Sequence, residues 1–95
     1  MDKVLNNLGL CLKAGYLISG TDAVCESLRF NKTCYIFLAS DASDNTKKKI
    51  LDKAKFYNVE VNMEYTSLEL SSALGKSGRM ALGITNEKFL KILKK

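Results

Sequence analysis

Histidine, proline and tryptophan are all absent from the 95-residue chain. Without histidine, the chain lacks the side chain that most often acts as general acid or base near neutral pH. The three cysteines, Cys11, Cys25 and Cys34, are odd in number and form no Cys-x-x-Cys pair. This spacing favours small core residues over a disulfide framework or a zinc site. We therefore expect no enzymatic activity, no metal ion and no cofactor.

Long hydrophobic runs are missing as well. No apolar run approaches the roughly 20 residues that a membrane helix needs, and no signal segment opens the chain. We therefore expect a cytoplasmic protein with no membrane partner. Apolar residues still make up 46% of the chain, which is enough to bury a modest core. With no internal repeat and no Gly/Ser-rich linker, residues 1–95 are expected to form a single domain.

The spacing of apolar residues predicts helices that alternate with strands. Leu5, Leu8 and Leu12 repeat at helical spacing, whereas Cys34–Ala39 is a continuous apolar run, typical of a strand covered on both faces. The expected order is helix 2–14, strand 17–18, helix 22–30, strand 34–39, a helix capped by Ser43 or Asp44 and stopped by Asn58, edge strand 59–62, helix 67–74 capped by Ser67, strand 80–84, and a helix starting at Asn86. Ala23 is expected to face inward. This order predicts an α/β fold, a three-layer α/β/α sandwich with a mixed four-stranded sheet.

The stretch from Lys13 to Asp22 joins the first two predicted helices. Gly20 lets a partner approach the backbone closely, and Thr21 or Asp22 can cap the next helix. The first amides of a helix have no intrahelical acceptor, and together with a glycine they often receive anions. A tight connection with no ligand explains the same residues, so both interpretations stay open.

Positive charge is in excess, with 15 Lys and Arg against 10 Asp and Glu, a net charge of +5. The densest run, Lys47-Lys48-Lys49, falls at the start of the third predicted helix. Each cation near a positive helix end costs about 0.3–1 kcal/mol, and a bound phosphate would offset this cost. A solvated helix face is the alternative explanation.

A second basic segment, Gly75-Lys76-Ser77-Gly78-Arg79, forms a flexible turn before a predicted strand. It is not a nucleotide-binding loop, because Leu70 stands where that motif requires glycine. It also differs from the Gly-x-x-Gly clamp of KH domains, which joins two helices.

Three segments resemble the kink-turn-binding ribosomal proteins of the L7Ae and L30e superfamily, in particular its small bacterial YlxQ branch. They are Ala14–Asp22, Phe37–Lys49 and Ala73–Arg79. The resemblance covers essentially the whole chain and implies an α/β/α sandwich. It also implies a non-catalytic protein that binds rRNA or other structured RNA in translation, with an association with the ribosome and no small-molecule substrate.

The resemblance implies RNA contact at the helix start after Gly20 and at the Gly75–Met80 loop. The family pattern Gly-x-Asn-Glu-x-x-Lys becomes Gly20, Asp22, Ala23 and Glu26 here, so only the glycine is kept. Asp22 and Glu26 place negative charge near phosphate, which should weaken ordinary kink-turn binding. The candidate RNA-binding residues are Lys13, Gly20, Thr21, Asp22, Lys47, Lys48, Gly75, Lys76, Ser77, Gly78 and Arg79. The alternative function is a protein-interaction module that docks on the ribosome or a translation factor through the aromatic side chains Tyr16, Tyr35, Phe56 and Tyr65.

Overall fold

A computed structural model describes residues 3–93, which form five helices and four strands. In chain order they are α1 (Lys3–Lys13), β1 (Leu17–Ser19), α2 (Thr21–Arg29), β2 (Tyr35–Leu38), α3 (Asp44–Phe56), β3 (Glu60–Asn62), α4 (Ser67–Leu74), β4 (Ala81–Ile84) and α5 (Glu87–Leu93). This is the alternation that the apolar spacing predicts. Asp2, the expected first residue of the first helix, lies outside the described residues.

The strands form one mixed sheet in the order β1-β4-β2-β3. β2 and β3 are parallel, and β4 is antiparallel to both β1 and β2, with Ile36 of β2 opposite Gly83 of β4. Every residue of β2 and β4 is buried, as expected for central strands with helices on both faces. β3 lies at an edge with Glu60 exposed, as predicted.

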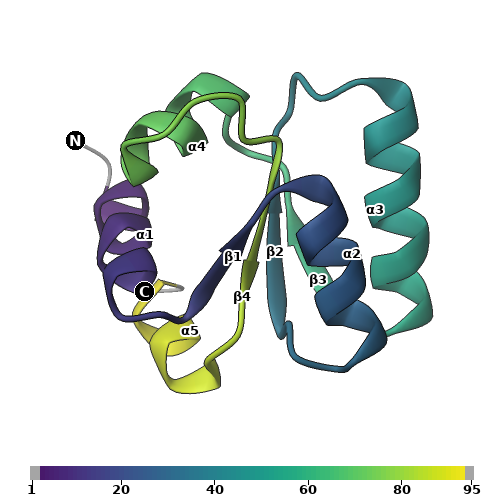
Figure 1. Ribbon diagram of the computed structural model, residues 1–95, viewed down its shortest axis with the longest axis horizontal. Helices are drawn as coiled ribbons and strands as arrows, with labels where there is room; N and C mark the ends of the chain where they lie inside the picture. Colours follow the sequence, from purple (N-terminus) through teal and green to yellow (C-terminus); the bar gives the residue numbers. More distant parts are fainter. Residues whose placement is uncertain (1–2, 94–95) are drawn as a thin grey trace.

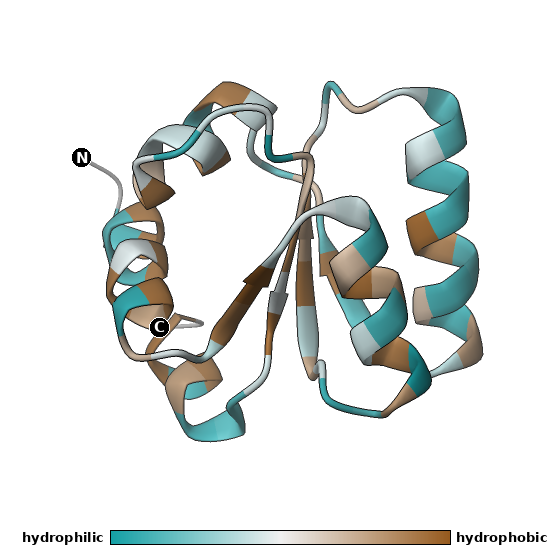
Figure 2. Cartoon of the chain, in the orientation of Figure 1, coloured by the Kyte–Doolittle hydropathy of each residue, from teal (hydrophilic) through white to brown (hydrophobic). Residues whose placement is uncertain are grey.

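Helices cover both faces of the sheet, which makes the fold a three-layer α/β/α sandwich. Figure 1 shows α2 and α3 on one face and α1, α4 and α5 on the other. Figure 2 shows hydrophobic residues along the strands and a largely hydrophilic α3. The prediction that Ala23 faces inward is wrong, since it is exposed while its neighbour Val24 is fully buried. None of the helices in residues 3–93 has the length and hydrophobicity of a membrane-spanning segment.

The three cysteines are free thiols. Cys11 and Cys25 are buried in the core, and Cys34 is half-buried with its Sγ donating to the carbonyl of Ile84 at 3.2 Å. Burial, with a smaller contribution from Cys34, raises the pKa of the Cys11 thiol to about 11. The thiol of Cys11 is therefore protonated near neutral pH and acts as a small apolar group.

One end of the sheet gathers most of the candidate residues. Because β1, β2 and β3 run in the same direction, all three end where β4 begins. Helices α2, α3 and α4 start at this end, at the top of Figure 1, and the segment between α4 and β4 passes over it. We call this end the rim. It consists of residues 20–22, 39–49, 63–67 and 75–80.

Candidate nucleic-acid interface

Gly20 is the N-cap of α2 and has φ 105° and ψ 141°, a backbone conformation that side chains rarely allow. Its N–H donates to the carbonyl of Ala81 at 2.9 Å, which ties the start of α2 to the start of β4. A Cβ built on Gly20 would meet no atom within 4 Å, so the space in front of this backbone is open. A ligand can therefore approach the main chain here.

The prediction that Thr21 or Asp22 caps α2 is wrong. Thr21 is already the first residue of the helix and Asp22 lies in its first turn. The helix start needs the positive φ of Gly20, and glycine has no side chain to accept a hydrogen bond. As a result α2 has no side-chain cap hydrogen bond, and its first amides keep their capacity to bind an anion.

Asp22 forms an ion pair with Lys49, with 3.1 Å between Oδ1 of Asp22 and Nζ of Lys49. This pair joins the first turn of α2 to α3, and the hydrogen bond and charge of Asp22 raise the pKa of Lys49. The side chain of Asp22 is 95% exposed, so the pair lies at the surface. The negative charge that the sequence places at this helix start is thus matched by a lysine from the neighbouring helix.

The start of α3 carries the other two lysines of the run. Ser43 is its N-cap, with Oγ accepting from the backbone N–H of Thr46 at 3.3 Å. Lys47 is half-buried and Lys48 is exposed, and both lie in the first two turns, as predicted. Lys49 was not among the candidate residues, because the lysine run alone does not reveal which member faces α2.

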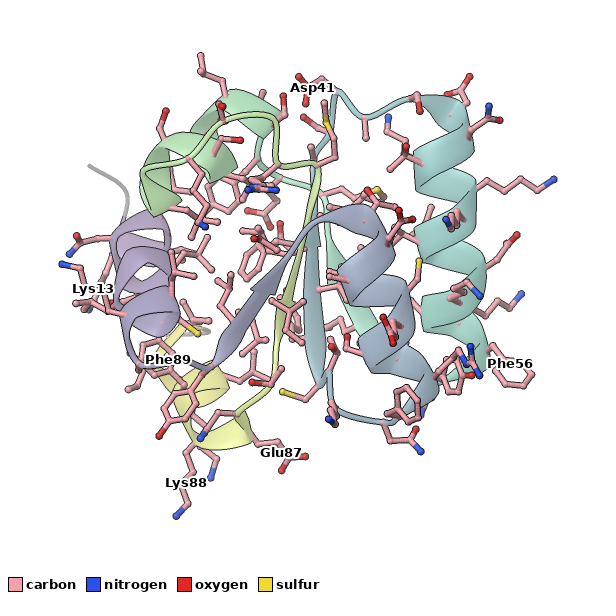
Figure 3. The ribbon with its side chains drawn as sticks, viewed as in Figure 1. Lys13, Asp41, Phe56, Glu87, Lys88 and Phe89 are labelled. Carbon is pink, nitrogen blue, oxygen red and sulfur yellow. The ribbon has the colours of Figure 1, made fainter. Side chains whose placement is uncertain are left out.

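Asp41 binds across the rim to α4, not to the helix that follows it in sequence. Its carboxylate accepts from the N–H of Ser67 at 2.7 Å and from the Ser67 hydroxyl at 2.8 Å. These hydrogen bonds, with a smaller contribution from the charge of Lys47, lower the pKa of Asp41. Figure 3 shows Asp41 at the upper end of the molecule, where these elements meet.

Ser67 does not cap α4, contrary to the prediction. The N-cap is Thr66, which forms a capping box with Glu69: the Thr66 hydroxyl accepts from the Glu69 N–H, and the Glu69 carboxylate accepts from the Thr66 N–H. The start of α4 is therefore occupied by side chains, as is that of α3. Of the three helix starts at the rim, α2 is the one without a side-chain cap.

The loop from Gly75 to Met80 leads from α4 into β4. Gly75 ends α4 with φ 68°, and Lys76 and Ser77 are exposed, as is Gly78. Arg79 is only half-exposed. Its N–H donates to the Ser71 hydroxyl at 2.9 Å, and its Nε is buried without a hydrogen-bond partner among residues 3–93. This loop presents Lys76 to solvent and holds Arg79 against α4.

Lys13 lies apart from the other candidate residues. It is the last residue of α1 and precedes β1, so it is near the end of the sheet opposite to the rim. Figure 3 shows it on the outer side of α1, away from Asp41. A contact at Lys13 would need a ligand that extends down one side of the molecule.

No group of three or more Cys, Asp or Glu side chains within residues 3–93 is placed to hold a metal ion. The groups that converge at the rim are backbone amides, lysines and carboxylates, of which Asp22 and Asp41 are engaged with Lys49 and Ser67. This set of groups suits a polyanion.

The chain matches the model of the ribosomal protein L7Ae/L30e/S12e/Gadd45 family over residues 2–94. It is 37% identical over 89 residues to the RNA-binding protein YlxQ of Enterococcus faecium, covering 94% of this chain and 85% of that one. It is 33% identical over 82 residues to the RNA-binding protein YlxQ of Bacillus subtilis, covering 86% and 82%.

Solved structures show the same fold. A protein of unknown function from Bacillus halodurans C superposes with a TM-score of 0.89 at 29% identity over the full length of both chains. A 15.5 kD RNA binding protein of Giardia lamblia superposes with a TM-score of 0.80 at 14% identity, covering 97% of this chain and 79% of that one.

Proposed function

Because the chain belongs to the ribosomal protein L7Ae/L30e/S12e/Gadd45 family, we propose that residues 1–95 are a single RNA-binding domain. The rim holds a structured, kink-turn-like RNA, and the protein acts in the cytoplasm in a ribosomal or translational context. The relatives that are named RNA-binding proteins support RNA as the partner. The role is binding, and it requires no catalysis by the chain.

The uncapped start of α2 is the observation that carries this proposal. Its free amides and the open space at Gly20 lie where three strands end, the position at which open α/β sheets commonly bind ligands. The positive end of the helix favours a phosphate there. The exposed side chains of Lys48 and Lys76 add charge on either side of it.

The contacts that this chain offers to an RNA differ from those of ordinary kink-turn-binding proteins. The family's asparagine, glutamate and lysine are Asp22, Ala23 and Glu26 in this chain, and Asp22 is engaged with Lys49. Binding therefore depends more on backbone amides and phosphate contacts than on side chains that read bases. We expect moderate affinity for kink-turns with a strong dependence on salt.

Filter binding with a kink-turn RNA and a ribosomal RNA hairpin tests the proposal. We expect affinity to fall steeply as salt rises, with a slope of about 0.9 in log K per phosphate contact. The double substitution Lys76→Ala with Arg79→Ala should make that salt dependence less steep, by the equivalent of one to two phosphate contacts. Salt-independent binding, or none to either RNA, would contradict the proposal, whereas wild-type affinity of the double variant would exclude the loop alone.

A protein-docking role is the second candidate, because two of the four aromatic side chains expected to serve docking are exposed. Phe56 is 79% exposed and Tyr16 is 39% exposed, whereas Tyr35 is buried and Tyr65 half-buried. Recovery of partners with and without ribonuclease separates the two functions. Partners that survive ribonuclease and depend on Phe56 or Tyr16 would favour docking.

A further inference from the structure

A groove runs along the outer side of α2, between this helix and the edge strand β1. Its volume is about 270 Å³, and it is lined by Ile18, Ala23, Glu26, Ser27, Phe30 and Lys32. This is slightly less than the ~300–1,000 Å³ of clefts that hold drug-sized ligands, so it suits one small planar group. Ala23, in the first turn of α2, places one end of the groove next to the rim.

Phe30 offers an exposed aromatic surface in this groove. Its ring is 60% exposed at the C-cap of α2. The Arg29 guanidinium lies 5.8 Å and the Lys32 ammonium 6.0 Å from the ring centroid. Both cations lie over the ring at distances near the outer limit of a cation–π contact, so each contact with the ring is weak. An aromatic ring beside cations is the arrangement with which proteins bind single-stranded nucleic acid.

Glu26 supplies an acceptor on the same helix, one turn before Phe30. Its carboxylate has neither an ion-pair nor a hydrogen-bond partner within residues 3–93. By contrast, the Ser27 hydroxyl is fixed by hydrogen bonds to the Val24 carbonyl and the Thr33 hydroxyl. Glu26 is thus the acidic group in the groove that is available to a ligand, and a carboxylate accepts well from the amino group of a base.

We propose that this groove binds one nucleotide of a single-stranded RNA segment, stacked on Phe30, with Glu26 accepting from its amino group and Arg29 and Lys32 holding phosphate. The inference rests on the proposed function, because the RNA strand reaches the groove from the rim. Phe30 lies nine positions after Thr21, which is about 14 Å along a helix. A strand that leaves the structured RNA at the rim follows α2 to reach this ring.

The test compares a kink-turn hairpin with the same hairpin carrying a single-stranded cytidine tail of about four nucleotides. The wild-type chain should bind the cytidine-tailed RNA more tightly than the tailless RNA. Phe30→Ala should weaken binding of the tailed RNA roughly 5- to 150-fold and leave the tailless RNA unchanged, because stacking on one base is lost. Phe56→Ala is the matched control, since Phe56 is an exposed phenylalanine at the end of α3 that packs on Tyr57 and does not line the groove.

Glu26→Gln and Phe30→Leu test the roles of the carboxylate and of the aromatic ring separately. A cytidine tail should bind about threefold to tenfold more tightly than a uridine tail, since uracil lacks the amino group that Glu26 accepts from. Glu26→Gln should remove most of that preference. Phe30→Leu keeps an apolar side chain and the fold. This variant should nevertheless bind the tailed RNA no more tightly than the tailless RNA.

Four outcomes overturn the inference. A tail that adds nothing to wild-type affinity, or a Phe30→Ala loss equal for both RNAs, removes the single-strand site while the rim proposal stands. Binding of an acidic aromatic peptide that depends on Phe30, with no tail effect, assigns the groove to a protein partner. Failure of the wild-type chain to bind either RNA overturns the proposed function itself.

Discussion

Asp22→Asn is expected to strengthen RNA binding. Asp22 holds the ammonium of Lys49 at 3.1 Å, so this lysine is engaged within the protein at the point where α2 and α3 meet. Asparagine removes the negative charge from the rim and releases Lys49 to a phosphate. The variant should therefore gain one phosphate contact.

The size of the gain follows from counterion release. One added contact steepens the fall of log K with log salt by about 0.9, the value for duplex DNA. At about 0.15 M salt this slope corresponds to roughly fivefold tighter binding. Filter-binding titrations of a kink-turn RNA at several salt concentrations measure both quantities.

Asp52→Asn is the matched control, because Asp52 is an exposed acid on α3 and its substitution changes the net charge equally. It should change affinity much less than Asp22→Asn. The second control is Asp22→Asn in a Lys49→Ala background, where the gain should disappear. An unchanged or weaker affinity of the single variant, or a gain that persists without Lys49, would refute the reasoning.

Three further predictions concern the fold. Gly9→Ala should lower the free energy of unfolding in urea by about 1 kcal/mol, because its Cβ would lie 2.9 Å from the Ala73 carbonyl oxygen and the clash outweighs the better helix propensity; a more stable variant would contradict this. Asp41→Asn should destabilise the protein near neutral pH, and the difference from wild type should shrink at acid pH. The Ser67 hydrogen bonds lower the pKa of Asp41, so their contribution is complete above its ordinary pKa of 3.8 and is lost as pH falls through the lowered value; a difference that is constant from pH 7 to the acid range would count against it. Cys11, with a pKa of about 11 and no exposed surface, should resist a thiol reagent at pH 8 until denaturant is added, as mass spectrometry of labelled peptides can measure.

The strands and most helix boundaries were predictable from local pattern. The apolar run around Ile36 identified a central strand because both of its faces must be covered, and Ser43 was one of two expected caps for α3. Asn86 was also expected at a helix start, and its Oδ1 accepts from the N–H groups of Lys88 and Phe89. In each case the cause lies within a few residues of the effect.

The features of the rim that sequence reasoning missed depend on contacts between distant segments. Asp41 accepts hydrogen bonds from Ser67, the first residue of α4, because the parallel pairing of β2 and β3 brings it to this residue, 26 positions later. Lys49 faces Asp22 because of how α3 is rotated against α2, which the lysine run does not specify. Gly20 replaces a polar cap because the turn out of β1 needs a positive φ. These contacts can be identified only once the packing of the helices and strands is known.

The order of the strands has a consequence for how the protein is made. Within residues 3–93, β4 is the last strand in sequence, yet it lies between β1 and β2, and it is the only strand that pairs with β1. A nascent chain that ends before residue 81 therefore cannot hold β1 in the sheet, and the Gly20–Ala81 hydrogen bond does not exist. Such non-local pairing is slow to form, because a long loop must close first. If the rim binds RNA as proposed, the site is complete only after β4 has been made and has paired with β1.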